Sequence, residues 1–244
     1  MGAFLVSPLD VPKDPGKKTM KTPAARKHIF PMRFQIQGKS LVFRRLSAEC
    51  KEPMIRFART LPETDLLFLE RDITRQPEVD QWIQDIAEGY LVTIVAWQDE
   101  TIVGYATFDR GRVRWTRHVA ELRVVVAESV RGLGIGRLLL ELVFEMALEV
   151  GATKIVARMT PDQVGAQRLF KRLGFEEEAV LRDHAMDANG LTHDLVVLSF
   201  RTRQHPEDCC GSCGVPVLTA LALDGSRLCS HCYESRYREI GGDG

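Results

Sequence analysis

The sequence has no long apolar run, no excess of one charge and few aromatic residues. Its 244 residues include 33 basic and 33 acidic side chains, so the formal net charge is zero. A neutral chain gives no electrostatic reason to expect nucleic acid or an anionic membrane as a partner. No apolar stretch approaches the roughly 20 residues of a membrane-spanning helix, and no signal-peptide pattern opens the chain. We expect a cytoplasmic protein with neither a membrane nor a nucleic-acid partner.

Cysteine is almost absent from the first 208 residues, where Cys50 stands alone, and the other five cysteines lie within the last 40 residues. A secreted disulfide framework usually staples a small, loop-rich chain throughout its length. Five clustered cysteines beside a large cysteine-poor segment favour metal binding instead.

Composition divides the chain into four segments. Residues 1–32 hold five prolines and many basic residues with little apolar content, which predicts a disordered basic tail, with a phosphate- or partner-binding arm as the alternative. Residues 33–200 alternate strand-like and helix-like patterns and predict one mixed α/β domain. The polar residues 201–208 form an expected linker, and residues 209–240 form a separate cysteine module.

Within the α/β domain, strands are expected at β-branched or apolar runs, and helices where apolar residues recur at helical spacing. The expected strands are 40–46, 91–97, 102–108, 119–126, 154–159, 178–186 and 193–200. The expected helices are 48–59, 78–88, a long helix that ends at Gly151, and 164–172. Polar, turn-rich residues join strands 91–97 and 102–108, and strands 178–186 and 193–200, so both pairs are expected to form hairpins.

A glycine-rich turn separates strand 119–126 from the long helix. Residues 131–137 read Arg-Gly-Leu-Gly-Ile-Gly-Arg. Glycines let the backbone approach a ligand closely, and the free N–H groups at a helix start attract phosphate. Arg131 and Arg137 could add charge-assisted bonds. The spacing fits neither the dinucleotide pattern G-x-G-x-x-G nor the Walker pattern G-x-x-x-x-G-K-(S/T). The turn indicates a phosphate or pyrophosphate site, with a tight strand–helix corner as the alternative.

Two motifs make this interpretation more specific. Residues 131–136 read R-x-x-G-x-G, and residues 163–175 read Q-x-x-A-x-x-L-F-x-x-x-G-F. In the same order they resemble the two signatures of the GNAT superfamily of N-acetyltransferases, (Q/R)-x-x-G-x-(G/A) and N-x-x-A-x-x-L-Y-x-x-x-G-F. The order of elements over residues 33–200 is also similar to that fold. The resemblance covers about two thirds of the chain.

The resemblance implies an α/β GNAT acyl-CoA N-acyltransferase fold, a mixed and mostly antiparallel sheet with flanking helices, and acetyl-CoA as cosubstrate. Backbone groups of the strand before the turn would contact the pantetheine arm, and the turn would hold the pyrophosphate. The implied cofactor-binding residues are Val124, Val126, Arg131, Gly132, Leu133, Gly134, Ile135, Gly136, Arg137, Gln163 and Phe170.

The resemblance also suggests a catalytic residue. An amine must lose a proton before it attacks a thioester. Glu121 lies ten residues before Arg131, which is the spacing of the catalytic glutamate in the histone-acetyltransferase branch, and is therefore the expected general base. The alternative is a structural glutamate that is ion-paired with Arg123 or Arg117. His118 is a second candidate, as base or proton relay.

Position 170 departs from the family pattern. Phe170 stands where the family commonly has a tyrosine that protonates the leaving CoA thiolate, and phenylalanine has no proton to give. The thiolate would then leave unprotonated, or water, Cys50 or a histidine would replace the tyrosine. This departure supports a rival hypothesis: a catalytically weak acyl-CoA-binding regulator whose cysteine module docks a protein or nucleic-acid partner.

The cysteine module has the spacing of a four-cysteine zinc site. Cys210-x2-Cys213 and Cys229-x2-Cys232 are separated by 15 residues, and each CxxC pair can place two sulfurs on one metal. We expect a zinc ribbon that binds Zn²⁺ through these four residues, because so short a segment cannot fold on its own apolar core. Disulfides and redox dithiols are the alternatives, and Cys209 is a spare or substitute ligand. The ribbon would dock a protein partner, present substrate or stabilise the fold.

The expected activity is acetyl transfer from acetyl-CoA to a primary amine by direct attack. The acceptor would be a protein lysine or N-terminus, or a small-molecule amine.

Overall fold

The structure is a computed structural model that describes residues 28–67 and 69–202 and, in the cysteine module, residues 210, 212, 221–223, 226–229 and 232. Residues 1–27, most of the linker, Cys209 and Cys213 lie outside the described residues. The predictions of a tail and of a complete ribbon therefore fall largely outside them as well.

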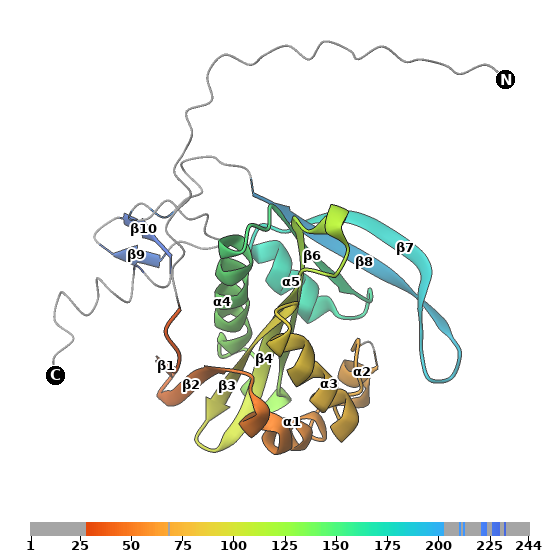
Figure 1. Cartoon of the computed structure of the whole chain (residues 1–244). Coiled ribbons are helices and arrows are strands. Elements are labelled where there is room, and N and C mark those ends of the chain that lie inside the picture. The colour runs from red at the N-terminus through yellow and green to blue at the C-terminus, as the bar shows by residue number, and fades with distance from the viewer. Residues whose placement is uncertain are drawn as a thin grey trace, which may run out of the picture.

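An eight-stranded sheet crosses the domain in the order β1-β2-β3-β4-β5-β6-β8-β7 (Figure 1). Only β5 and β6 are parallel; all other neighbouring strands are antiparallel. The strands are β1 (Met32–Ile36), β2 (Lys39–Arg45), β3 (Leu91–Gln98), β4 (Thr101–Asp109), β5 (Val119–Val126), β6 (Lys154–Met159), β7 (Glu176–Met186) and β8 (Thr192–Arg201). In the cysteine module, β9 (Leu221–Leu223) and β10 (Ser226–Leu228) form a separate antiparallel pair.

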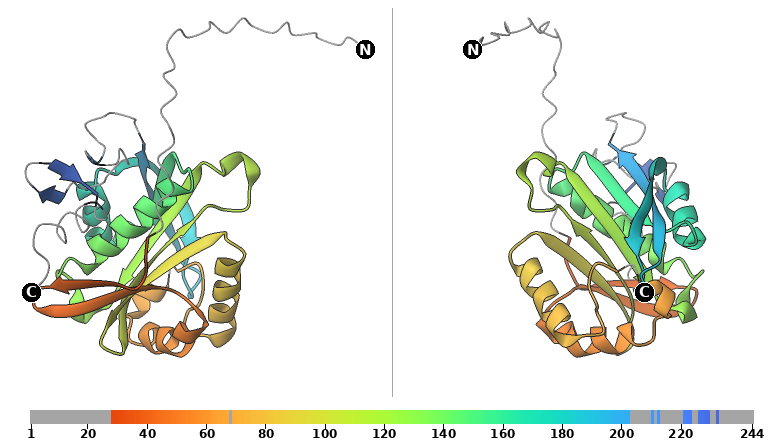
Figure 2. Two further views of the ribbon diagram at one scale, coloured as in Figure 1. Left: turned by 60° about the vertical axis from the view of Figure 1, so that its left-hand side comes forward. Right: turned by 90° about the vertical axis from the view of Figure 1, so that its right-hand side faces the viewer.

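Helices cover both faces of the sheet (Figure 2). They are α1 (Lys51–Ala58), α2 (Glu63–Leu66), α3 (Gln76–Ala87), α4 (Ile135–Glu149) and α5 (Val164–Arg172), with short 3₁₀ turns η1 (Ala48–Cys50), η2 (Arg114–Thr116) and η3 (Glu128–Val130). Helices α4 and α5 pack on one face in the larger apolar core, whereas α1 and α3 pack on the other face against β3 and β4. Successive side chains of a strand point to opposite faces, so β4 serves both cores, with Phe108 in the larger and Tyr105 in the smaller.

The predicted strands and helices of residues 40–200 are all present. Strands β5 and β6 and helix α5 begin and end at the predicted residues. Strand β1 and helix α2 were not predicted. Strand β1 pairs with β2 through a tight turn at Gln37 and Gly38, both with positive φ. Such a turn is typical of a β-hairpin. It was missed because it follows directly on a segment whose composition predicted a disordered tail. His28 also lies in that segment, yet it is only 7% exposed. Within the described ranges, no helix combines the length and apolar character needed to cross a bilayer.

A buried carboxylate ties helix α3 to the loop that follows β4 and to the loop that precedes α3. Asp85 of α3 is 5% exposed. Its oxygens accept hydrogen bonds from Arg71 (2.5 Å), Arg112 (3.0 Å) and Gln81 (3.1 Å). Burial by itself raises the pKa of Asp85, but the hydrogen bonds from Gln81 and Arg71 and the charges of Arg71 and Arg112 outweigh it, so the pKa is lowered.

We expect Asp85→Asn to lower the free energy of unfolding by about 2–3 kcal/mol at pH 7, because it leaves the guanidinium of Arg71 without its counter-charge. A carboxylate with a lowered pKa in the folded state stabilises the protein above its unfolded-state pKa, and this contribution is lost as the pH falls through the folded-state pKa. The difference between the two proteins should therefore shrink below about pH 4. Urea titrations across pH measure it. Asp80→Asn, on the same helix with a 45% exposed side chain paired with Lys51, should cost less than about 1 kcal/mol.

Candidate functional site

The parallel strands β5 and β6 separate part-way along their length. They pair only from Val119 to Glu121 of β5, opposite residues 154–156 of β6, although β5 continues to Val126 and β6 to Met159. Beyond Glu121, β5 stays paired with β4, and among the described residues no strand pairs with its other edge. Backbone N–H and C=O groups at such an edge require partners. The gap can therefore accept an extended ligand that bonds to the backbone of Val124 and Val126.

The glycine turn places a helix start beside this gap. Gly132 and Gly134 have φ of 77° and 91°, a left-handed conformation that glycine adopts without strain. Gly134 is the N-cap of α4, and the first bond within the helix runs from the Leu138 N–H to the Gly134 carbonyl at 3.1 Å. The N–H groups before Leu138 have no carbonyl within the helix to bond. Together with the helix dipole they form an anion site.

The two arginines of the turn are held by carboxylates of the protein. The guanidinium of Arg131 pairs with Asp65 of α2, and its Nε donates to the Val126 carbonyl at 3.3 Å. Arg137 Nε lies 2.9 Å from the Glu141 carboxylate. In this state the anion site consists of backbone N–H groups. A role of the arginine side chains in binding phosphate stays a prediction.

Glu121 lies where the two strands separate, and it is ion-paired. Its carboxylate accepts two hydrogen bonds from Arg158 of β6, one of them from Nε at 3.0 Å, and lies 3.5 Å from Arg123 Nη2. The hydrogen bond to Glu121 is the main cause of a raised pKa of Arg158. The pair with Arg123 was foreseen as the alternative to a catalytic role, whereas the pair with Arg158 was not. An ion-paired carboxylate at the end of the gap is compatible with either role, so the general base stays a prediction.

A pocket lies on the α1–α3 face beside Glu121. Its lining residues are Leu69, Glu70, Arg71, Ile73, Trp82, Leu91, Tyr105, Thr107 and Arg123. Arg123 connects the pocket with Glu121, because it lines the pocket and its guanidinium pairs with the Glu121 carboxylate. Burial raises the pKa of the Tyr105 phenol well above its usual value. This pocket was not predicted, because its residues come from five separate segments.

The other predicted residues have structural contacts. His118 precedes β5 at the end where β5 and β6 are paired. Its side chain is exposed, and its carbonyl accepts bonds from Thr153 (2.8 Å) and Lys154 (3.1 Å). Gln163 is the N-cap of α5, and its Oε1 accepts a bond from the Thr160 N–H at 3.0 Å. The Phe170 ring is 2% exposed and packs edge-on against Phe175. A catalytic role of His118 and cofactor contacts of Gln163 and Phe170 stay predictions.

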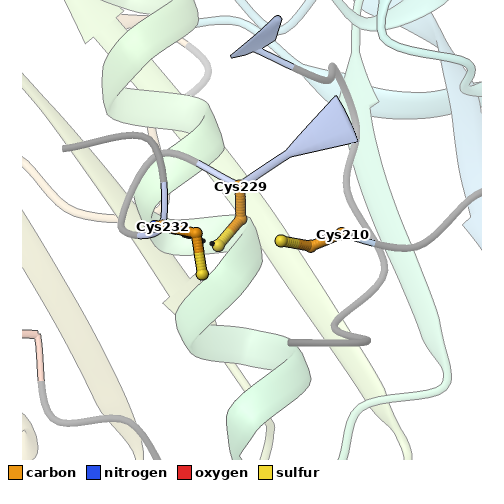
Figure 3. A group of neighbouring side chains, drawn as sticks. All are labelled: Cys210, Cys229 and Cys232. Atoms are coloured by element: carbon orange, nitrogen blue, oxygen red, sulfur yellow. Dashed lines mark hydrogen bonds between the residues drawn. The ribbon is translucent and has the colours of Figure 1, made fainter. Parts of the chain in front are cut away.

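Three of the four predicted metal ligands meet (Figure 3). The sulfurs of Cys210, Cys229 and Cys232 lie within 4.8 Å of one another, and all three residues are buried. The Cys232 N–H donates to Cys229 Sγ at 3.4 Å. Burial, reinforced by the charges of Glu145, Cys210 and Cys232, raises the pKa of the Cys229 thiol to about 12. Cys213, the fourth predicted ligand, lies outside the described residues. The three thiols could share one soft metal ion.

Comparison with known proteins finds similarity in the segment that holds the gap and the glycine turn. Residues 57–175 match the model of the acetyltransferase (GNAT) family. The matched segment makes up just under half of the chain. The match includes strands β3 to β6, the turn and helices α4 and α5, and it supports the resemblance inferred from the two motifs.

One curated relative is similar in sequence. The chain is 31% identical over 144 residues to N-acetylaspartate synthetase of Xenopus tropicalis, a match that covers 58% of this chain and 47% of that protein. The chain thus spans about half the length of this relative.

Solved structures confirm the α/β GNAT fold. Ribosomal-protein-alanine N-acetyltransferase from Brucella melitensis superposes with a TM-score of 0.58 at 24% identity, over 65% of this chain and 98% of that chain. The structure of yncA from Salmonella typhimurium, determined with its cofactor acetyl-CoA, superposes with a TM-score of 0.58 at 23% identity, over 68% of this chain and 95% of that chain.

Proposed function

We propose that this protein is an N-acetyltransferase that moves the acetyl group of acetyl-CoA to a primary amine. The observation that carries the proposal is the gap between β5 and β6, which has a helix-start anion site beside it and a carboxylate where it closes. A long ligand with an anionic end and a reactive end fits this arrangement. The GNAT domain and the acetyl-CoA in the yncA structure support the same cofactor.

In this proposal the cofactor lies along the free edge of β5. The backbone of Val124 and Val126 bonds to the pantetheine arm, and the N–H groups of the turn bind the pyrophosphate. Gly136 permits the close approach of helix α4 to strand β5, because a Cβ at this position would lie only 3.1 Å from Val126 Cγ2. The thioester then lies near Glu121.

The chemical step needs no intermediate on the enzyme. The amine nitrogen forms a bond to the thioester carbon, the carbon–sulfur bond breaks, and CoA leaves as a thiolate. Glu121 accepts the proton that the amine loses, directly or through one water. Arg158 and Arg123 hold the carboxylate in a fixed orientation, which lowers the entropy lost on reaching the transition state. Phe170 cannot protonate the thiolate, whose pKa of roughly 8.5 lets it leave as an anion.

The acceptor side is the pocket beside Arg123. Two of the three similar proteins have names that point to different acceptors: N-acetylaspartate synthetase and ribosomal-protein-alanine N-acetyltransferase. Both a small amine and a protein amine therefore remain within the proposal. The rival function, a CoA-binding regulator, is favoured by one observation: Phe170 is a core residue without a proton to give.

Glu121→Gln separates the enzyme from the regulator. We expect turnover to fall by about 10²–10⁴-fold, because the base is lost, while the dissociation constant of acetyl-CoA stays within about threefold. The assay follows thiol release and acetylated products by mass spectrometry over a panel of peptides and small amines. Glu178→Gln is the control, since Glu178 of β7 pairs with Lys154 of β6 at 2.5 Å. Unchanged turnover in Glu121→Gln would remove Glu121 from its role, and CoA binding without transfer to any amine would favour the regulator.

Gly134→Ala tests the anion site. Both Gly134 and Gly151, which follows the other end of α4, have φ near 90° and open space where a Cβ would lie. Alanine at either position should cost a similar 1–2 kcal/mol of stability. Only Gly134→Ala should weaken acetyl-CoA binding, by at least about tenfold, because it disturbs the N–H groups that bind pyrophosphate. Calorimetric titration measures both. Equal affinities in the two variants would place the pyrophosphate elsewhere.

We also propose that the cysteine module binds one Zn²⁺ through Cys210, Cys213, Cys229 and Cys232. The support is the group of three buried sulfurs and the N–H···S bond within the second CxxC pair. Bound there, zinc would cross-link the two CxxC pairs and so stabilise a segment too short to fold on an apolar core.

Metal analysis checks the zinc proposal. Elemental analysis of the purified protein should find about one zinc per chain, and Cys229→Ser should lose it, because a hydroxyl is a poor zinc ligand. Cys50→Ser is the control, since Cys50 is buried in the α1 region of the smaller core, and it should keep the metal. Zinc retained in Cys229→Ser, or absent from the unaltered protein, contradicts the proposal.

A further inference from the structure

The loop between β4 and β5, residues 110–118, has an exposed apolar tip among cations. It reads Arg-Gly-Arg-Val-Arg-Trp-Thr-Arg-His, with four arginines and no acidic residue. Trp115 is 81% exposed and Val113 is 45% exposed. The yellow-green loop projects from the end of the sheet (Figure 2, left). A tryptophan left so fully in water forgoes the free energy that burial of its ring would give, so the loop is suited to a surface outside the chain.

The base of this loop is fixed to the domain. The guanidinium of Arg112 lies over the ring of Tyr90, 4.5 Å from its centroid, and donates a hydrogen bond to Asp85 at 3.0 Å. Arg110 Nη1 donates to the carbonyl of Val150, at the end of α4, at 3.3 Å. These contacts use two of the four arginines to hold the loop, so the tip is presented from a firm support.

The tip itself satisfies its backbone and keeps two charges available. It is the 3₁₀ turn η2, in which the N–H and the hydroxyl of Thr116 both donate to the Val113 carbonyl at 3.1 Å. Backbone groups that are already bonded cost less to move out of water. Arg114 and Arg117 are exposed, and within the described part of the chain neither forms an ion pair. The tip can therefore enter a less polar surface while its arginines meet anions.

The mixture of indole, aliphatic and guanidinium groups favours a phospholipid surface. Tryptophan is enriched at the level of the lipid headgroups, and arginines are attracted to anionic lipids. Single-stranded nucleic acid also binds arginines and stacks on aromatic rings, but it usually lies in a groove. This loop is a projection, and the exposed Val113 has no ring on which a base could stack. The zero net charge of the whole chain averages out this local excess of cations.

The hairpin of β7 and β8 provides a natural contrast. Met186 and Leu191 near its end are 65% and 62% exposed, so this hairpin also shows water apolar side chains. It carries Asp183, Asp187 and Asp194, however, and therefore has no excess of cations to offer an anionic surface. Exposed apolar residues occur in both places, but only loop 110–118 combines them with arginines alone.

We propose that loop 110–118 is a membrane-docking loop. It binds anionic phospholipid headgroups through Arg114 and Arg117 and places Val113 and Trp115 at the boundary between headgroups and acyl chains. The inference does not rest on the proposed acetyl transfer. The loop precedes β5 and the glycine turn follows it, so docking occurs at the end of that strand opposite to the anion site.

Cosedimentation of the full-length protein with lipid vesicles tests the proposal. Vesicles of phosphatidylcholine alone are compared with vesicles that also contain phosphatidylserine. We expect Trp115→Ala to lower the partition coefficient on the anionic vesicles by about tenfold. Arg114→Ala combined with Arg117→Ala should lower it by about 25-fold, about fivefold for each arginine. Salt at about 0.5 M should remove most of the arginine contribution, because it screens exposed charges.

Tryptophan fluorescence reports the same event directly. Trp82 is only 3% exposed, so the indole that vesicles can reach most readily is that of Trp115. Anionic vesicles should shift the emission of the protein to shorter wavelengths as this indole leaves water. The shift should be absent in Trp115→Phe, and a shift that persists in this variant contradicts the docking of Trp115.

Two control variants match the changes elsewhere on the surface. Leu191→Ala removes another exposed apolar side chain, and Arg56→Ala with Arg59→Ala removes two exposed arginines of the α1 region and so changes the net charge equally. Both should bind vesicles as the unaltered protein does. All the substituted side chains are exposed, so thermal unfolding should stay unchanged and verify the fold.

Three results overturn the proposal. One is equal partitioning onto neutral and anionic vesicles, or none at all. The second is full binding in both loop variants, which would assign it to other cations such as the basic side chains of residues 1–27. The third is Trp115-dependent binding of a single-stranded RNA oligonucleotide without binding to vesicles. The acetyl-transfer assay contains no lipid, so its failure is distinguishable from failure of membrane docking.

Discussion

The close packing of α4 on strands β4 and β5 is the contact on which the rest of the site depends. It is possible because the chain has no side chain at two points of contact. A Cβ at Gly104 of β4 would lie 2.9 Å from the Val125 carbonyl oxygen and 3.3 Å from Leu139 of α4, and a Cβ at Gly136 would lie 3.1 Å from Val126. Because α4 lies so close to the two strands, its N-terminal turn lies beside the free edge of β5. The anion site and the gap between β5 and β6 are thereby placed side by side.

The sequence predicts those parts of the fold that arise from local pattern. Strand β5 contains a β-branched run, α5 has helical spacing, and the glycine turn between β5 and α4 has a recognisable spacing of its own. Two elements, β1 and α2, were not predicted from the sequence. Strand β1 follows a proline-rich, basic segment, so average composition outweighed its hairpin signal, and α2 is a single turn with too few residues to show a helical period.

The site was predictable only as far as motifs reach. The backbone edge, the turn and Glu121 follow from a resemblance to a known family, but their charged partners do not. Arg158 pairs with Glu121 over 37 residues of sequence, and Arg131 pairs with Asp65 over 66 residues. Such ion pairs depend on which strands are neighbours in the sheet and on which loops lie close together in the fold, and neither can be read from local sequence. The same holds for His28, whose Nε2 lies 3.3 Å from Glu149 of α4. Among the described residues, Cys229 and Cys232 of one CxxC pair meet Cys210 of the other pair. Spacing within a pair is a local property, and the zinc site stays a prediction.

The gap between β5 and β6 also determines what can enter it. An unpaired strand edge at the border of a sheet invites another polypeptide to add a strand, which is a common route to aggregation. The free edge of β5 lies inside the sheet instead, bounded by β6 and closed at one end where the two strands pair. A second polypeptide would need to fit its side chains between two strands that converge. The edge of β5 is thus protected from strand addition by another polypeptide. Its backbone groups, apart from the Val126 carbonyl that accepts a bond from Arg131, are available to a slender, nearly unbranched molecule.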